Sequence, residues 1–267
     1  MRCTKDSSPD APRLADASAF RFLAVKLVGF VLVGCVIALG GCTRHPRTLD
    51  SSHVVFVVHG AGGFGSTYND LIDALDSDED SSRTVRLFRW GAPGPLFMFN
   101  FSNQSIHDKA ERELASEIQR WQAAHADGDA RVDLVGHSAG CGVILGALAQ
   151  LDKSQVDRVI LLHPSVSPMY PLSGAVAHVR STMHVFYSDR DTVFLKWRCS
   201  QFGTYDRVKT PAAGYMGFDL ANLPGTLRER VHQHAHQGAW SSLGDDGGHF
   251  GALNRPFVNN LVVPLLR

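Results

Sequence analysis

The stretch from Arg131 to Leu151, RVDLVGHSAGCGVILGALAQL, contains the pattern that decides the fold. RVDLV is typical of a strand, and the apolar segment from Ala139 to Leu151 is typical of a buried helix. Between them stands GHSAG, residues 136–140, which has the form G-x-S-x-G. A tight turn from strand to helix lifts a serine hydroxyl clear of a sheet, and flanking glycines relieve its crowded backbone. Ser138 is therefore a candidate nucleophile.

Strand-like and helix-like segments alternate around this turn. β-Branched and aromatic runs predict strands at 53–58, 85–90, 156–163 and 183–188, and apolar spacing predicts helical segments at 67–75, 105–125 and 255–265. This alternation is typical of an α/β protein with a mostly parallel central sheet and helices on both faces. Residues 165–180 and 194–246 show long stretches without clear periodicity, and we expect them to form a pocket wall or a small lid.

The composition excludes one class of function. Lys plus Arg and Asp plus Glu each number 26 among 267 residues, and no block of basic residues is present. Neither a global nor a local basic field favours nucleic acid, so we expect no nucleic-acid partner. The 267 residues are 44% hydrophobic, enough to bury a large core, and the part from 53 to 267 has the length of one domain.

The first 42 residues have the pattern of a targeting segment. Arg21 and Lys26 precede the apolar run LVGFVLVGCVIAL (27–39), which is followed by Gly40-Gly41-Cys42 and polar residues. This resembles the signal of a bacterial lipoprotein, which implies a lipid on Cys42, a tether at 43–52 and an exported, membrane-anchored protein on the periplasmic or extracellular side. Cleavage at Cys35, plain cleavage or a retained helix over 20–41 are the alternatives.

The remaining motifs resemble those of the α/β-hydrolase superfamily, whose members include lipase- and esterase-like serine hydrolases. The resemblance covers about 53–266 and rests on GHSAG, on His59-Gly60-Ala61-Gly62 after the first strand, and on two later loops. It implies an α/β-hydrolase fold. It also implies that the backbone N–H groups of Ala61 and Ala139 form an oxyanion hole, with Gly62 as the alternate donor.

The same resemblance supplies the expected acid and base, because the family order is nucleophile, acid, base. The strand-like MHVFYS leads into Asp189-Arg190-Asp191-Thr192-Val193, where Asp191 fits the acid and Asp189 is the alternative. Gly247-Gly248-His249-Phe250 fits the loop that carries the base. The expected activity is hydrolysis of small-molecule or lipid carboxylic esters through an acyl-enzyme, without metal or cofactor. His163 is expected to be a structural or pocket histidine, and His137 a packing residue.

Other interpretations stay open at this point. The same triad would serve an acyltransferase or a thioesterase, and a lipid-anchored binding protein could keep the fold without turnover. Gly60–Gly65 also satisfies G-x-G-x-x-G, and Tyr205 with Lys209 forms Y-x-x-x-K, which together suggest a nicotinamide-dependent oxidoreductase, but Arg89 and Trp90 stand where such a fold needs an acidic residue. His232, His234 and His236 would share one strand face and could bind zinc. Cys141 and Cys199 could form one disulfide, although Cys141 fits a buried core position.

Overall fold

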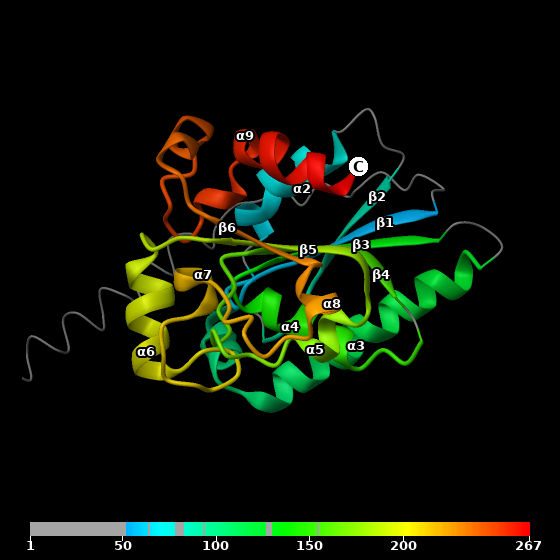
Figure 1. The fold of residues 1–267 in the computed structure, drawn as a ribbon, viewed down its shortest axis with the longest axis horizontal. Coiled ribbons are helices and arrows are strands. Elements are labelled where there is room, and N and C mark those ends of the chain that lie inside the picture. Colours follow the sequence, from blue (N-terminus) through cyan, green and yellow to red (C-terminus); the bar gives the residue numbers. More distant parts are fainter. Residues whose placement is uncertain (1–51, 64, 78–82, 93, 127–129, 154) are drawn as a thin grey trace, which may run out of the picture. The chain divides into compact units, whose positions relative to one another are not determined.

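A computed structural model describes residues 52–267, except 64, 78–82, 93, 127–129 and 154. Its centre is a six-stranded sheet with the order β2-β1-β3-β4-β5-β6, in which every paired strand is parallel (Figure 1). This confirms the predicted α/β-hydrolase architecture. The strands are β1 (His53–Val58), β2 (Arg83–Phe88), β3 (Arg131–His137), β4 (Val156–Leu162), β5 (Val179–Tyr187) and β6 (Val231–Ala235).

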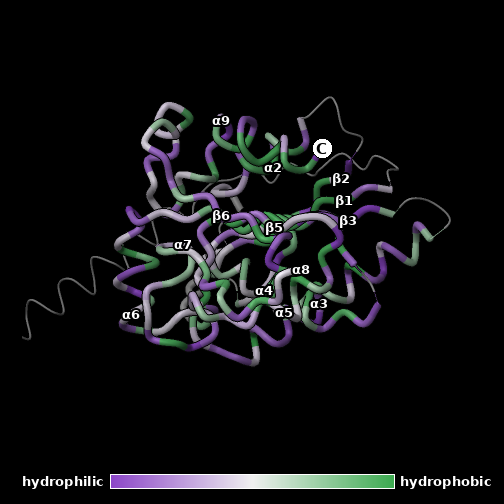
Figure 2. Tube along the Cα trace, viewed as in Figure 1, coloured by the Kyte–Doolittle hydropathy of each residue, from purple (hydrophilic) through white to green (hydrophobic). Residues whose placement is uncertain are grey.

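Helices cover both faces of the sheet, as parallel crossovers require. On one face lie α3 (Gln104–Ala124), α4 (Ala139–Ala149) and α5 (Ser173–Val176), and on the other lie α2 (Asn69–Asp76) and the C-terminal segment of α9 (Arg255–Phe257), η6 (Val258–Val262) and η7 (Val263–Leu266) (Figure 1). Alternate residues of β1 therefore enter different cores: Val54, Phe56 and Val58 pack toward α3 and α4, and Val55 and Val57 toward α2 and α9. Burial on both sides is why β1 is hydrophobic from Val54 to Val58, and Figure 2 shows hydrophobic residues at the centre of the sheet.

Short helical segments connect these elements. They are η1 (Gly65–Tyr68), η2 (Gly94–Phe101), η3 (Thr192–Arg198), α6 (Cys199–Phe202), α7 (Ala213–Met216), α8 (Gly225–Arg228), η4 (Gly238–Leu243) and η5 (Gly251–Leu253). All but α8, which directly precedes β6, follow the carboxyl end of a strand. Three predictions are corrected here. β2 lies at 83–88 rather than 85–90, β5 begins at Val179 rather than Met183, and β6 was not expected as part of the sheet.

The sequence of β6 does not indicate a strand. VHQHA contains one buried residue, Val231, because the strand lies at the edge and pairs only with β5. An edge strand with polar side chains lacks the apolar run by which central strands are found. Its position matters for function, since the loop that follows β6 leads to His249.

Other sequence expectations have mixed outcomes. Cys35 and Cys42, the leader and most of the tether lie outside the described residues. In the part that is described, no helix is long and apolar enough to cross a membrane. Cys141 and Cys199 are both buried and free, so they form no disulfide.

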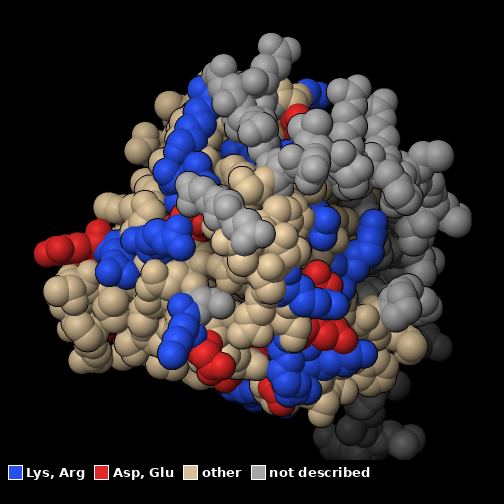
Figure 3. Space-filling view, turned by 90° about the vertical axis from the view of Figure 1, so that its right-hand side faces the viewer, with Lys and Arg blue, Asp and Glu red and all other residues tan. Residues whose placement is uncertain are grey.

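Figure 3 shows the side where the strands begin, where Lys and Arg lie among Asp and Glu.

Candidate active site

Ser138 stands at a strained turn between β3 and α4. Its φ and ψ are 55° and −121°, in a region that side-chain-bearing residues rarely adopt and that costs about 1 to 3 kcal/mol. Its N–H donates to the carbonyl of Leu162 over 3.0 Å, which ties the turn to β4. A Cβ on Gly140 would lie 2.2 Å from the carbonyl oxygen of Val58, so that position has no room for a side chain. The glycine pattern thus reflects close packing of α4 against β1.

His249 joins Ser138 to Asp191. Its Nε2 lies 3.0 Å from Ser138 Oγ, and its Nδ1 lies 2.5 Å from Asp191 Oδ2. Because the carboxylate only accepts, Nδ1–H donates to it, and Nε2 is left to accept the serine hydroxyl proton. The structure therefore brings together the three residues expected from sequence. Asp189, the alternative acid, lies in the loop after β5 and is exposed to solvent.

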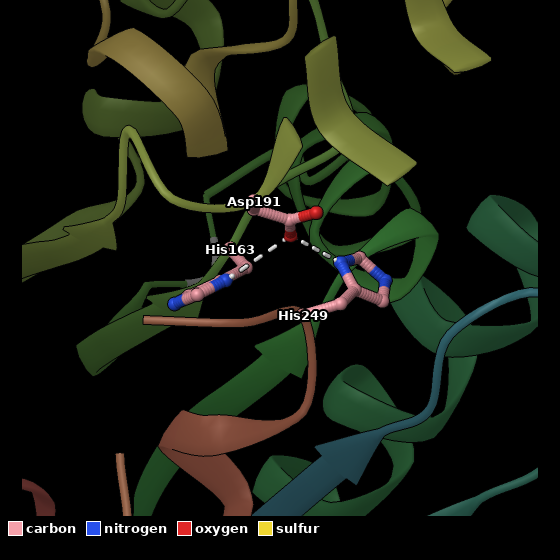
Figure 4. Close-up of side chains that lie close together, drawn as sticks. All are labelled: His163, Asp191 and His249. Atoms are coloured by element: carbon pink, nitrogen blue, oxygen red, sulfur yellow. Dashed lines mark hydrogen bonds and ion pairs between the residues drawn. The ribbon is translucent and has the colours of Figure 1, made fainter. Parts of the chain in front are cut away.

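Asp191 is held by donors on both of its oxygens. Oδ1 accepts from the backbone N–H groups of Phe194 and Leu195, each over 3.3 Å, at the start of η3. Oδ2 accepts from His249 and also from His163 Nδ1, which lies 3.4 Å away (Figure 4). Burial raises the pKa of this carboxyl, but the hydrogen bonds and charges of the two histidines outweigh it and hold the pKa well below its usual value. Asp191 is therefore ionised.

The imidazole of His249 is tuned to be neutral. Burial lowers its pKa below 6.5, because the imidazolium would lose its hydration. The hydrogen bond and the charge of Asp191 raise the pKa, whereas the charges of His163 and Arg198 lower it. The ring of Phe194 stacks on the imidazole with centroids 4.5 Å apart. A neutral ring with a free acceptor nitrogen is the form that a general base requires.

His137 has a role that the sequence did not reveal. The N–H of Gly60 donates to Tyr68 Oη over 2.6 Å, and Tyr68 Oη lies 2.9 Å from His137 Nδ1. On its other side, His137 Nε2 donates to the backbone carbonyl of His249 over 2.8 Å. Burial lowers the pKa of His137 well below its usual value, so one neutral tautomer satisfies the whole chain of bonds. His137 therefore links the loop after β1 to the loop that carries His249.

The loop after β1 is fixed by buried polar contacts. Asn100 Nδ2 donates to the carbonyl of Ala61 over 2.9 Å, and the Asn100 side chain also bonds to the N–H and carbonyl of Ala92. His59 accepts from the N–H of Trp90 over 3.1 Å, and burial lowers the pKa of His59 to about 4. Ala61 and Ala139 are both buried, and Ala139 is the first residue of α4. Its N–H belongs to the group at a helix start that has no partner inside the helix.

The other predicted residues are placed differently. Tyr205 and Lys209 lie outside any helix, and Tyr205 Oη donates to Glu111 over 2.8 Å, which corrects the dehydrogenase interpretation. His232 and His234 lie on β6 beside His184 of β5, whose Nδ1 is 2.9 Å from His234 Nε2. His236 lies past the end of β6 and bonds to the carbonyl of Asp245. His236 therefore does not share a strand with His232 and His234, as the predicted zinc site requires.

One group of described side chains has the spacing of a metal site. The ligand atoms of His163, Asp191 and His249 lie within 4.8 Å of one another. Two ligands of a tetrahedral zinc ion with bonds of about 2.0 to 2.1 Å would be about 3.3 Å apart. The Nδ1 of His249 is only 2.5 Å from Asp191 Oδ2, a separation that fits a charge-assisted hydrogen bond. The cluster therefore fits a hydrogen-bonded group of one aspartate and two histidines better than a metal centre.

The parallel sheet, the strained serine turn and the loops that follow β5 and β6 define an α/β hydrolase. A family model described as "Alpha/beta hydrolase of unknown function (DUF900)" matches residues 42–200, more than half of the chain, and the chain belongs to this family. A search of curated proteins found no significant match.

Several solved structures are similar to this chain at low sequence identity. A candidate aryl esterase from Burkholderia cenocepacia is 11% identical with a TM-score of 0.53, over 84% of this chain and 93% of that one. A carboxylesterase from Bacillus subtilis is 8% identical with a TM-score of 0.42, over 91% and 97% of the two chains. An acetylxylan esterase is 13% identical with a TM-score of 0.48, over 80% and 96%. At 11% identity, the likeness to the first of these structures shows the fold alone.

Proposed function

We propose that the chain is a serine hydrolase that cleaves carboxylic esters, with Ser138 as nucleophile, His249 as general base and Asp191 as the acid that orients the base. The observation that carries the proposal is the continuous hydrogen-bonded path from Ser138 Oγ through the imidazole to Asp191 Oδ2, with separations of 3.0 and 2.5 Å. A serine hydroxyl becomes an effective nucleophile only when a base takes its proton.

The proposed reaction follows from these contacts. His249 Nε2 takes the proton of Ser138, and Oγ attacks the ester carbonyl to form a tetrahedral intermediate. The backbone N–H groups of Ala61 and Ala139 stabilise the oxyanion, a contribution worth about 3 to 4 kcal/mol for each donor in related chemistry. His249 then protonates the leaving alcohol, and water releases the acyl group from Ser138. Every step uses groups of this chain and needs no metal or cofactor.

A fluorophosphonate probe tests this proposal without knowledge of the substrate, because it labels only activated serines. We expect the full chain to be labelled, Ser138→Ala to be unlabelled, and His249→Ala and Asp191→Asn to be labelled far more slowly. Ser173→Ala, which removes an exposed serine at the start of α5, is the matched control and should label like the wild type. A folded wild type that remains unlabelled would contradict the proposal and favour a non-catalytic binding protein.

We further propose that the enzyme is exported and anchored to a membrane through a lipid on Cys42. The support is the sequence pattern at 21–42, together with a tether that is long enough to separate the lipid from β1. Metabolic labelling with a clickable fatty acid should mark the wild type but not Cys42→Ala. Equal labelling of both proteins, or none of either, would overturn the lipid anchor.

A further inference from the structure

Arg198 places a cation beside the candidate site. It ends η3, the segment that begins directly after Asp191, and its side chain is only partly exposed. The guanidinium carbon lies 3.9 Å from the centre of the Phe101 ring, and Nη1 lies 3.7 Å from Cys199 Sγ. Among the described residues, no carboxylate forms an ion pair with Arg198.

This environment leaves most of the guanidinium's binding capacity unused. A guanidinium has five N–H donors, whereas a thiol is a weak acceptor and an aromatic face replaces only part of the lost hydration. Burial accordingly lowers the pKa of Arg198. The nearby carboxylate of Asp206 is engaged elsewhere, since it accepts from the N–H and Oγ of Ser167 and from Thr204. Buried cations in proteins are normally paired, so an anion from outside the chain would fit here.

Arg198 lies at the same end of the sheet as the candidate site. Phe101 ends η2, which follows β2, whereas Arg198 belongs to η3, which follows β5. The contact between them therefore joins loops at the carboxyl ends of two strands that flank β1, β3 and β4 in the sheet. Ser138 follows β3 at this same end, and the charge of Arg198 reaches His249 strongly enough to lower the pKa of its imidazole.

We propose that the substrate is an ester that also carries an anionic oxygen group, a carboxylate or a phosphate, which the guanidinium of Arg198 binds while Ser138 attacks the ester carbonyl. This inference rests on the proposed function. A planar guanidinium binds such groups through two parallel N–H···O bonds, and the apolar surroundings of Phe101 strengthen the attraction.

Matched pairs of esters test the proposal with the full chain at pH 8, where His249 is neutral. p-Nitrophenyl hydrogen glutarate against p-nitrophenyl valerate places the charge on the acyl part, and 4-acetoxybenzoate against its methyl ester places it on the alcohol part. We expect the wild type to prefer the anionic member of at least one pair. Arg198→Met should lower kcat/KM for that member about 10- to 100-fold, mainly through KM, and change the neutral member less than about twofold.

Two controls separate charge recognition from structural damage. Arg198→Lys keeps a cation but loses the planar fork, and we expect it to recover part of the preference. Lys196→Met removes an exposed cation from the same segment and should leave both pairs unchanged. An equal loss for charged and neutral esters in Arg198→Met, or a wild type without preference for the anionic members, would overturn the anion site.

A binding experiment keeps this inference separate from the proposed function. In the Ser138→Ala background, calorimetry should detect p-nitrophenyl hydrogen glutarate or 4-acetoxybenzoate, and 4-acetoxyphenyl phosphate tests a phosphate in the same place. Addition of Arg198→Met should weaken the binding about 10-fold or more. If the wild type hydrolyses no ester but binding in the Ser138→Ala background depends on Arg198, the proposed function alone is refuted. If the wild type hydrolyses esters but Arg198→Met leaves the binding unchanged, the anion site alone is refuted.

Discussion

Two aspartates that are separated by one residue have different surroundings, and we expect them to differ in their effect on activity. Asp191 accepts a hydrogen bond from His249, whereas Asp189 is exposed on the same loop. We expect Asp191→Asn to lower kcat for an ester by about 10⁴-fold, because an amide favours the wrong imidazole tautomer. Asp189→Asn, the matched control, should lower kcat less than about threefold by the same reasoning. Stopped-flow or plate assays with a p-nitrophenyl ester measure both, and the reverse order of effects would reassign the acid.

His137 gives a second prediction for a single side chain, because it holds the backbone of His249. His137→Phe keeps an aromatic ring but cannot donate to the carbonyl of His249 or accept from Tyr68. We expect kcat to fall about 10- to 100-fold with little change in KM, as for other groups that orient a reacting residue. His137→Gln retains a donor and an acceptor and should keep more of the activity. A KM effect without a kcat effect would argue against positioning.

The pH dependence of the reaction follows from the burial of His249. In the proposed mechanism only the neutral imidazole accepts the serine proton, so we expect kcat/KM to fall as the pH drops through the pKa of His249. Because burial lowers this pKa below 6.5, the acid limb for a neutral ester should lie below pH 6.5. Arg198→Met removes a charge that lowers the pKa, and we expect it to shift the limb to higher pH. An acid limb above pH 6.5 in the wild type would show that the carboxylate of Asp191 outweighs burial.

The sequence indicated the three residues of the proposed triad, which the structure brings together, but not the side chains that support them. Ser138 stands in a motif whose spacing is local, and the order of acid and base along the chain located Asp191 and His249. The support from His137 and His163 depends on which strands are neighbours. Tyr68 is 69 positions from His137 along the chain, and Asp191 is 28 from His163. No local pattern contains such pairs, and the sequence therefore predicts His137 only as a packing residue and His163 only as a structural or pocket residue.

At the scale of elements, α4 is a helix whose glycines are required by contacts. Gly140→Ala would place a Cβ 2.2 Å from the backbone oxygen of Val58, and a backbone atom in a central strand has little freedom to move. We expect this substitution to lower the free energy of unfolding by about 1 to 3 kcal/mol or more. Gly174→Ala in α5 meets only Ala149 at 3.5 Å and serves as the control. Urea unfolding followed by circular dichroism compares the two, and equal stabilities would contradict the close approach of α4 to β1.

The elements also differ in how closely the bounds predicted from sequence match those in the structure. β1, β4 and α3 were predicted almost to the residue, because burial on two faces or on one helical stripe leaves a strong pattern. β2 was shifted because Arg83 and Thr84 are buried although they are polar. The segments after β5 are short helical turns without the regular apolar spacing of a longer helix. Their conformations are set by contacts with the loops after β2 and β4.

At the scale of the whole molecule, the C-terminal segment completes the second core. Phe257 is fully buried and meets Phe186 and Trp240 with ring centroids 5.6 and 5.4 Å away. We expect Phe257→Ala to lower the free energy of unfolding by about 3 to 5 kcal/mol, because it leaves a cavity under the sheet. Phe202→Ala removes a ring that is 70% exposed and should change stability by less than about 0.5 kcal/mol. Thermal unfolding measures both, and similar melting temperatures would contradict this core.

The distribution of the triad along the chain also sets the order in which activity can arise. His249 is 111 positions beyond Ser138 and 58 beyond Asp191. A growing polypeptide that has been synthesised through β5 contains the nucleophile and the acid but not yet the base. If the proposed export and the proposed triad both hold, a chain that is translocated before it folds would assemble its active site only on the far side of the membrane. The late position of His249 would then keep any partly synthesised chain without its base.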